Sequence, residues 1–430
     1  MWPRLRFSVL PHLHIYRTFS RQLASVAESK KPTNRHVSID AEGNRITTFT
    51  YVSEPLGNPP EHGYGWPRLD FEEVVGRGEW IIKRKLGWGI SSSTWLALDQ
   101  TRKCYVAIKV LKTSENMRAD LGHSFEFEAL QAVTVTRTPS PHILKLRAAF
   151  NHMGKGRDGN HLCYVTQLHG GNVARLIGDG TVPFPFPLAK RIILHTLRGI
   201  AHMHKHGGNM SDEDITSWLI SDPSRRHDPE DSPDGIVEAA VSQPFPLPSV
   251  DDAMERTFLL GDYSHAQPCS ERPPESIAIL PHRPPENVIL CPWNEKTDIW
   301  QFGCLVYDLP FQAYELVTSQ WLFDWNHHPE YGPEVNLLYQ MMNVTGERFS
   351  VAELSKGQKT RDYFDQDGSL LTKLPYVDDN YSLKMKKLKH LSDVDIASTS
   401  QLLSRCLRLH PADRPSAADL LSDPFFVGVD

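Results

Sequence analysis

The sequence lacks any pair of cysteines in CxxC spacing, although it contains six cysteines in 430 residues. A structural zinc site or a disulfide framework is therefore not indicated, and free buried thiols in a reducing compartment are the better interpretation. No apolar run approaches the roughly 20 residues that a membrane-spanning helix needs. Acidic and basic residues nearly balance, 52 against 46, so no basic excess indicates direct binding of nucleic acid.

What the chain does have is length and apolar content. Hydrophobic residues make up 40% of it, which is enough to fill a core, and 430 residues suffice for more than one structural unit. The 27 glycines and 32 prolines indicate many loops and exclude a long coiled coil.

The first 27 residues contain neither Asp nor Glu but carry four arginines. A helix from Ile15 would place Arg17 and Arg21 on one side and a row of apolar residues on another. An Arg-rich, acid-poor, amphipathic start is typical of a mitochondrial presequence, and a basic tail without structure is the alternative interpretation.

The rest of the chain predicts an α+β fold with two lobes. Residues 28–77 are polar and rich in glycine and proline, which predicts an extended lead-in. Residues 78–168 contain short strand-like runs and one helical pattern, which predicts a small antiparallel-sheet lobe. Helical patterns dominate 169–426 and predict a larger helical lobe. Within it, residues 221–256 are acidic and Pro-rich and predict a loop insertion, a surface excursion without a role of its own.

A possible phosphate site lies in the small lobe. Gly87 and Gly89 separate two strand-like runs, and such glycines let backbone N–H groups approach phosphate oxygens, although a plain turn is the commoner meaning of this spacing. Lys109 ends the strand-like run VAIK, and Glu126 follows on the predicted helix. A strand lysine beside a glycine hairpin can hold the phosphates of ATP when a carboxylate orients it, whereas the plainer interpretation is a solvated lysine at the end of a buried strand.

These residues, in this order, resemble the N-terminal lobe of eukaryotic protein kinases. The phrase KLGWGISSSTWLALD resembles the SR-protein kinases in particular. Later motifs follow in the family's order: LGDYS with Asp262 resembles Asp-Phe-Gly, RPPE with Glu286 resembles Ala-Pro-Glu, TDIW contains Asp298, and HPADRP contains Arg414. The resemblance covers about 78–426 and implies a bilobal kinase fold with ATP and Mg²⁺ as cofactors.

The resemblance also assigns roles to individual residues. It implies that Glu286 pairs with Arg414 and that both, with Asp298, hold the large lobe together. It implies a protein substrate rich in Arg and Ser, and we expect a monomer. The residues implied for the nucleotide and metal are Leu86, Gly87, Gly89, Lys109, Thr166, Gln167 and Leu168 for ATP, and Asp262 and Ser217 for Mg²⁺.

The catalytic loop departs from the family pattern. Asp212 takes the position of the base, but Asp214 replaces a lysine and Ser217 replaces a metal-binding asparagine. A charge pair at ~4 Å is worth about 4 kcal/mol at an effective dielectric near 20, so the lysine-to-aspartate change costs powers of ten in rate. Two functions remain open: a serine/threonine protein kinase with reduced activity, and a pseudokinase that binds nucleotide or a partner.

Two further expectations follow. Pro310 lies in a segment that otherwise resembles a core helix, and proline inside a helix predicts a break there or a spurious segment in the sequence. SR-protein kinases act in the cytoplasm and nucleus, whereas the first 27 residues indicate mitochondria, so the compartment stays open.

Overall fold

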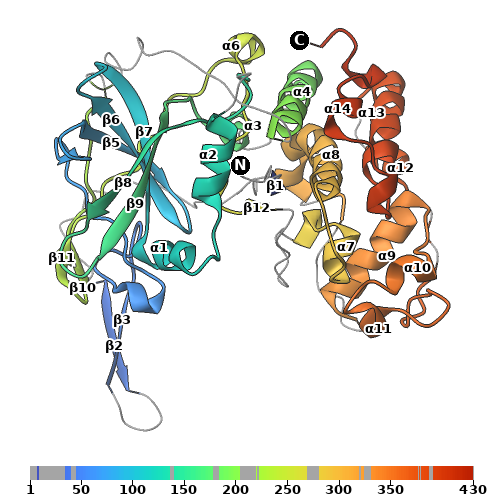
Figure 1. Ribbon diagram of the computed structural model, residues 1–430, viewed down its shortest axis with the longest axis horizontal. Helices are drawn as coiled ribbons and strands as arrows, with labels where there is room; N and C mark the ends of the chain where they lie inside the picture. Colours follow the sequence, from blue (N-terminus) through green and yellow to red (C-terminus); the bar gives the residue numbers. More distant parts are fainter. Residues whose placement is uncertain are drawn as a thin grey trace.

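The computed structural model describes residues 7–8, 34–39, 45–135, 140–177, 184–203, 219, 222–268, 280–318, 321–323, 331–375, 377, 379–386 and 391–429. It has a lobe built on a sheet and a lobe built of helices, side by side (Figure 1). The sheet has six strands in the order β4-β5-β6-β7-β9-β8, and every neighbouring pair is antiparallel. The strands are β4 (Val74–Val75), β5 (Trp80–Trp88), β6 (Ser92–Asp99), β7 (Cys104–Leu111), β8 (Leu146–Met153) and β9 (Asn160–Gln167).

Strand β7 shows why this lobe forms. Its residues alternate, so that Val106, Ile108 and Val110 enter the buried core of the sheet while Ala107 and Lys109 point to the opposite face. Two helices follow β7, namely α1 (Thr113–Asp120) and α2 (Glu126–Thr134). The alternation thus presents Lys109 on the face that is not filled by the core.

The large lobe forms around long helices that share one apolar core. Its main helices are α4 (Phe186–Met203), α8 (Lys296–Thr318), α9 (Pro333–Thr345) and α13 (Asp393–Cys406). Shorter helices are α3 (Val173–Ile177), α6 (Val250–Glu255), α7 (Pro285–Val288), α10 (Val351–Leu354), α11 (Thr360–Tyr363), α12 (Tyr381–Met385) and α14 (Ala417–Leu420). Helices α8 and α13 approach closely at Gly303, where an added Cβ would lie 2.8 Å from Leu407.

The break expected at Pro310 is wrong, because α8 is one helix from Lys296 to Thr318. In its first half Ile299, Trp300 and Phe302 are completely buried. Burial of three large side chains stabilises this helix by more than the roughly 3 kcal/mol that an interior proline costs.

Residues 222–247 lie against the small lobe, not on the surface of the large lobe where the sequence placed them. We call these residues the strap. Asp222 binds the fully buried Arg84, with 3.2 Å between Oδ2 and Nη1. Ala240 enters the apolar core of the sheet. The polar composition predicted a solvent-exposed loop. It does not reveal the packing, because polar residues of the strap are partners of buried basic groups.

The strap also contacts the lead-in. It contains the strands β10 (Glu230–Ser232) and β11 (Gly235–Val237), which lie beside the small-lobe sheet (Figure 1). Val237 and Ala239 form a buried apolar cluster with Leu56 and Trp66 of the lead-in. The insertion and the lead-in therefore cover the outside of the small lobe together.

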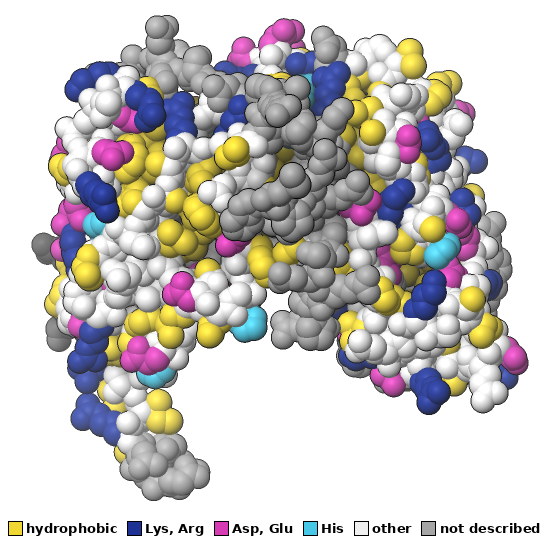
Figure 2. Space-filling model, in the orientation of Figure 1, with side chains coloured by type: hydrophobic (Ala, Val, Ile, Leu, Met, Phe, Trp, Pro, Cys, Tyr) yellow, Lys and Arg dark blue, Asp and Glu magenta, His cyan; other side chains and the backbone are white. Residues whose placement is uncertain are grey.

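The lead-in begins with a hairpin of β2 (Arg35–Ile39) and β3 (Arg45–Phe49) that projects from the body and carries exposed arginines (Figure 2). Farther along, Glu54 forms a buried ion pair with Lys85 of β5. Trp66 packs edge-on against Trp88, which lies between the two glycines of the hairpin, with 5.6 Å between ring centroids.

Little of the segment 1–27, the predicted presequence or basic tail, lies in the described part of the chain. Strand β1 (Phe7–Ser8) pairs antiparallel with β12 (Gln267–Pro268), and the remaining residues of 1–27 lie outside the described residues. None of the described helices combines the length and the apolar character needed to cross a bilayer. The described cysteines are unpaired by disulfides, as expected: Cys104, Cys163, Cys291, Cys304 and Cys406.

Candidate active site

Three elements bring one ammonium and two carboxyl groups together between the lobes. Strand β7 supplies Lys109, helix α2 supplies Glu126, and the segment after Leu260 supplies Asp262. Lys109 Nζ lies 2.6 Å from Glu126 Oε1 and 3.2 Å from Asp262 Oδ1. Glu126 is buried at 3% exposure, and Lys109 keeps 19% of its side chain accessible. The structure thus brings together three of the residues that the sequence singled out.

The charges of this cluster depend on one another. Burial disfavours each charged form, but the carboxyl groups of Asp262 and Glu126 outweigh it and raise the pKa of Lys109. Partial desolvation opposes ionisation of Asp262, whose side chain is 42% exposed, yet the ammonium and the hydrogen bonds from Ser264 hold the pKa of that carboxyl well below its usual range. Burial raises the pKa of Glu126. Asp262 is therefore ionised at neutral pH, and an ionised carboxylate is the type of hard oxygen donor that Mg²⁺ prefers.

The backbone at Asp262 is unusual. Its φ is +58°, in the left-handed region that non-glycine residues seldom adopt. Ser264 Oγ donates a hydrogen bond of 2.8 Å to Asp262 Oδ1, the same oxygen that faces Lys109. The residue that replaces the family's glycine therefore contacts the expected metal ligand, a contact that the spacing of the motif gives no reason to expect.

The glycine hairpin leaves room for a ligand. A Cβ added at Gly87 or at Gly89 would contact no atom of the described chain within 4 Å. Gly89 N donates to Ser92 O at 2.9 Å and closes the turn. Open backbone beside a lysine and an ionised aspartate is a donor set that fits a nucleotide phosphate with a divalent cation.

Three of the residues that the resemblance implies for ATP lie at the end of β9, and we call Thr166, Gln167 and Leu168 the hinge. Thr166, Gln167 and Leu168 are all buried there. Leu168 forms an apolar cluster with Leu96, and Leu86 packs against it. The sequence prediction did not name four further members of this cluster: Tyr105, Ala107, Leu219 and Phe245. Ala107 lies inside the VAIK run, whereas Phe245 lies in the insertion, where no motif marks it.

The catalytic loop is not part of the described structure. Asp212, Asp214 and Ser217 lie outside the described residues, so their roles stay predictions. Within the described ranges there is no group of three or more His, Cys, Asp or Glu side chains arranged to hold a metal ion.

In the large lobe, Glu286 and Arg414 form a buried two-pronged ion pair. The two bonds measure 2.7 and 2.8 Å, and the residues are 4% and 1% exposed. Thr297 Oγ1 also donates to Glu286, and the Arg414 guanidinium lies 5.2 Å from the centroid of the Trp300 ring. Asp298 is buried beside them at the start of α8.

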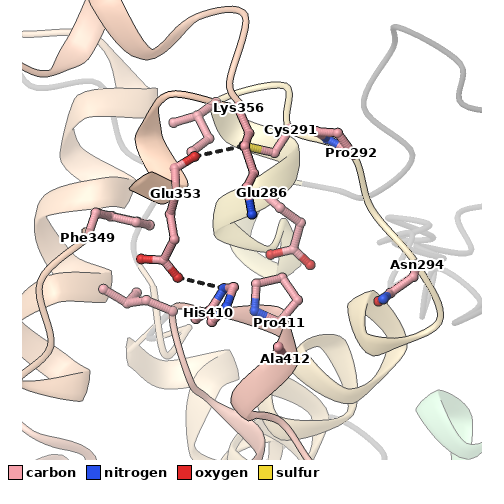
Figure 3. A pocket seen from close by; sticks show the side chains of 12 residues that line it. Glu286, Cys291, Pro292, Asn294, Phe349, Glu353, Lys356, His410, Pro411 and Ala412 are labelled. Atoms are coloured by element: carbon pink, nitrogen blue, oxygen red, sulfur yellow. Dashed lines mark hydrogen bonds and ion pairs between the residues drawn. The ribbon is translucent and has the colours of Figure 1, made fainter. Parts of the chain in front are cut away.

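A separate pocket of about 190 Å³ has Glu286 as one of its lining residues (Figure 3). Glu286 on its wall is bound to Arg414. Glu353 Oε1 lies 2.6 Å from His410 Nδ1, and its carbonyl oxygen accepts a hydrogen bond from Cys291. Both carboxyl groups that line the pocket are therefore already engaged, which argues against it as a cation-binding site.

Known proteins share this architecture. No protein-family model matches the chain. It is 22% identical over 503 residues to the protein kinase dsk1 of Schizosaccharomyces pombe, covering 93% of this chain and 90% of that protein. It is 24% identical over 417 residues to the serine/threonine-protein kinase SRPK of Physarum polycephalum, covering 88% of this chain and 93% of that protein.

A solved kinase domain shows the same fold. It superposes with a TM-score of 0.54 at 18% identity, over 84% of this chain and 98% of that one. The chain thus has the bilobal α+β fold of protein kinases, as predicted, and its homologues are serine/threonine kinases of the SR-protein kinase type.

Proposed function

We propose that this chain is an ATP- and Mg²⁺-dependent serine/threonine protein kinase with reduced activity that phosphorylates Arg/Ser-rich protein segments. The observation that carries the proposal is the contact of Lys109 with both Glu126 and Asp262, at 2.6 and 3.2 Å. Three residues separated by up to 153 positions meet there, from two lobes. A pairing of lysine with a helix glutamate and a metal-binding aspartate is what phosphoryl transfer requires.

Each residue has a defined part in this proposal. Glu126 orients Lys109, whose ammonium binds the nucleotide phosphates, and the hairpin of Gly87 and Gly89 covers them. The adenine lies against Leu86 and the hinge residues Thr166, Gln167 and Leu168. Asp262 holds Mg²⁺, with Ser217 as a weaker second ligand. The bound metal and nucleotide supply charge neutralisation and the phosphoryl group.

Asp212 accepts and orients the substrate hydroxyl in this proposal. The substitutions at Asp214 and Ser217 reduce the rate. Asp214 adds negative charge near the phosphates, and Ser217 has a shorter side chain than the metal-binding asparagine that it replaces. A carboxylate close to the transferring phosphoryl group repels it, and a few kcal/mol of lost stabilisation lowers the rate by two or more powers of ten.

A pseudokinase that binds nucleotide is the second candidate. The hydrogen bond from Ser264 to Asp262 favours it, because that hydroxyl competes with a metal ion for the same carboxylate oxygen. The two candidates share the nucleotide pocket and differ in whether the phosphoryl group leaves it.

Restoring the family's catalytic residues separates the candidates. We expect Asp214→Lys together with Ser217→Asn to raise phosphorylation of an Arg/Ser-repeat peptide at least tenfold, about 1.4 kcal/mol of barrier. The same protein with Asp212→Asn added is the matched control and should fall to background, which excludes a contaminating kinase. If the double variant stays at background while ATP still binds, the pseudokinase function is correct.

A further inference from the structure

The strap crosses the small lobe at the edge of the proposed nucleotide pocket. Gln243 N donates a hydrogen bond of 2.9 Å to the carbonyl of Lys85, the residue before Leu86. Two residues farther along, the carbonyl of Phe245 accepts a hydrogen bond of 3.1 Å from Arg175 of α3. The strap is thus attached to strand β5 at Gln243 and to the first helix after the hinge at Phe245.

The side chain of Phe245 belongs to the apolar cluster at the hinge. Leu96 and Leu168 are the buried centre of this cluster, and Phe245 packs against it with Leu86 and Ala107. Ala107 shares a face of β7 with Lys109, two residues away. Phe245, which is half-buried, therefore shares a cluster with residues on the Lys109 face and at the hinge.

We propose that Phe245 is a nucleotide-binding residue, supplied by the insertion, which forms the outer wall of the adenine pocket. This inference rests on the proposed function and adds a residue to it from outside the kinase motifs. An aromatic ring offers a large, apolar and flat surface to a purine base. Because hydrogen bonds hold the strap backbone at Gln243 and at the carbonyl of Phe245, little freedom is lost when the base binds.

The position of the wall predicts which part of the ligand it recognises. Phe245 lies among apolar residues at the hinge, whereas Lys109 lies with the carboxyl groups of Glu126 and Asp262. Loss of the ring should therefore weaken binding of the base whether or not phosphates are attached. Loss of the lysine should weaken only ligands that carry phosphates.

Calorimetric titration of the full-length chain with Mg-ATP, and separately with adenosine, tests the inference. Phe245→Ala should weaken both ligands at least fivefold, and Phe245→Leu should weaken them less, since it keeps apolar volume. Leu247→Ala is the matched control: this residue of the strap is 40% exposed and outside the cluster, so both affinities should stay unchanged. Lys109→Met should weaken Mg-ATP and leave adenosine unchanged.

Each outcome has one meaning. An affinity of Phe245→Ala equal to or higher than that of the parent overturns the inference, as does an equal loss in Leu247→Ala. If the parent binds neither ligand, the proposed function itself fails. Melting curves without ligand identify a variant that does not fold, and in that case the Phe245→Leu titration decides alone: a loss supports the wall, and parental affinity overturns it.

Discussion

Lys109 is held by two carboxyl groups that come from different lobes. Its contact with Glu126 lies within the small lobe, and its contact with Asp262 crosses to the large lobe. Removing the ammonium leaves a buried carboxyl group, Glu126, without its cation. The lysine therefore has a structural role besides the binding role that we propose for it, and an experiment on it needs a control for stability.

We expect Lys109→Met to abolish the rise in melting temperature that ATP produces, because the phosphates lose their ammonium partner. The measurement is a thermal-shift titration with Mg-ATP. Lys83→Met is the matched control, since Lys83 is a strand lysine of similar exposure whose partner, Glu72, is 67% exposed, whereas Glu126 is buried. A normal ATP-dependent shift in folded Lys109→Met protein contradicts the proposed site.

Magnesium dependence should follow Asp262. We expect ATP to bind more tightly with Mg²⁺ than without it, and Asp262→Ala to remove this difference, because the ionised carboxylate is the main hard ligand. The check is calorimetric titration of ATP with Mg²⁺ and with EDTA. Asp367→Ala, at an exposed loop position, should keep the full difference. An unchanged magnesium effect in Asp262→Ala would place the metal elsewhere.

At the scale of helices and strands, residue periodicity predicted most of the fold. The strand-like run that ends at Lys109 corresponds to β7, and the helical patterns of 169–426 correspond to helices such as α4. The strap was not predictable in this way, because Asp222 and Gln243 are polar residues that bind buried groups of β5. Pattern rules assign polar residues to solvent and cannot recognise a polar side chain whose partner is distant in sequence.

In the candidate site, too, some contacts follow from residue periodicity and others do not. The spacing from Lys109 to Glu126 predicted a contact that the structure contains, because both residues belong to regular elements whose faces follow from their periods. The hydrogen bond from Ser264 to Asp262 depends on a left-handed φ in a loop, and Phe245 reaches the hinge through an insertion. Neither has a periodic signal in the sequence.

Helix α4 contains a histidine that makes stability depend on pH. His195 is 2% exposed, its Nδ1 accepts a hydrogen bond from Phe258 N at 3.2 Å, and burial lowers its pKa to about 3. An unfolded histidine has a pKa of about 6.5. Between about pH 3 and 6.5 the unfolded chain therefore binds a proton at this position and the folded chain does not. The stabilisation is complete above about pH 6.5 and is lost as the pH falls toward 3.

The unfolding free energy of the parent should fall when the pH is lowered from 7 to 5. We expect His195→Asn, which keeps an acceptor near the position of Nδ1, to make this fall smaller by about 2 kcal/mol. Urea denaturation at the two pH values measures it. His36→Asn, on the exposed β2, should lose as much stability as the parent. Equal losses in all three proteins would show that His195 is protonated in the folded state.

The whole molecule is held together by contacts between distant segments. The backbone of residues 142–144, which precedes β8, exchanges hydrogen bonds of 2.8 Å with Leu260, two residues before Asp262. The strap ties α3 to β5 across the hinge. These links keep the lobes in the relative position that the contact of Lys109 with Asp262 requires.

Arg414 has the same role inside the large lobe. Its guanidinium binds both carboxylate oxygens of Glu286, across 128 positions, and also donates to the carbonyl groups of Lys296, Arg408 and Leu409. One side chain thus joins α7, the start of α8 and the segment after α13. Its loss leaves Glu286 buried without its cation and several carbonyl groups without a donor.

We expect Arg414→Ala to cost roughly 3–5 kcal/mol of unfolding free energy, because a buried charge loses its partner. At about 2–4 °C for each kcal/mol in a large domain, the melting temperature should fall by at least about 5 °C. Arg408→Ala is the matched control: this arginine also binds a glutamate, Glu347, but keeps 40% of its side chain exposed, so its loss should lower the melting temperature by far less. Calorimetric melting of both variants compares a buried with an exposed pair in one lobe, and equal melting temperatures would mean that Glu286 is stabilised mainly by Thr297 and its surroundings.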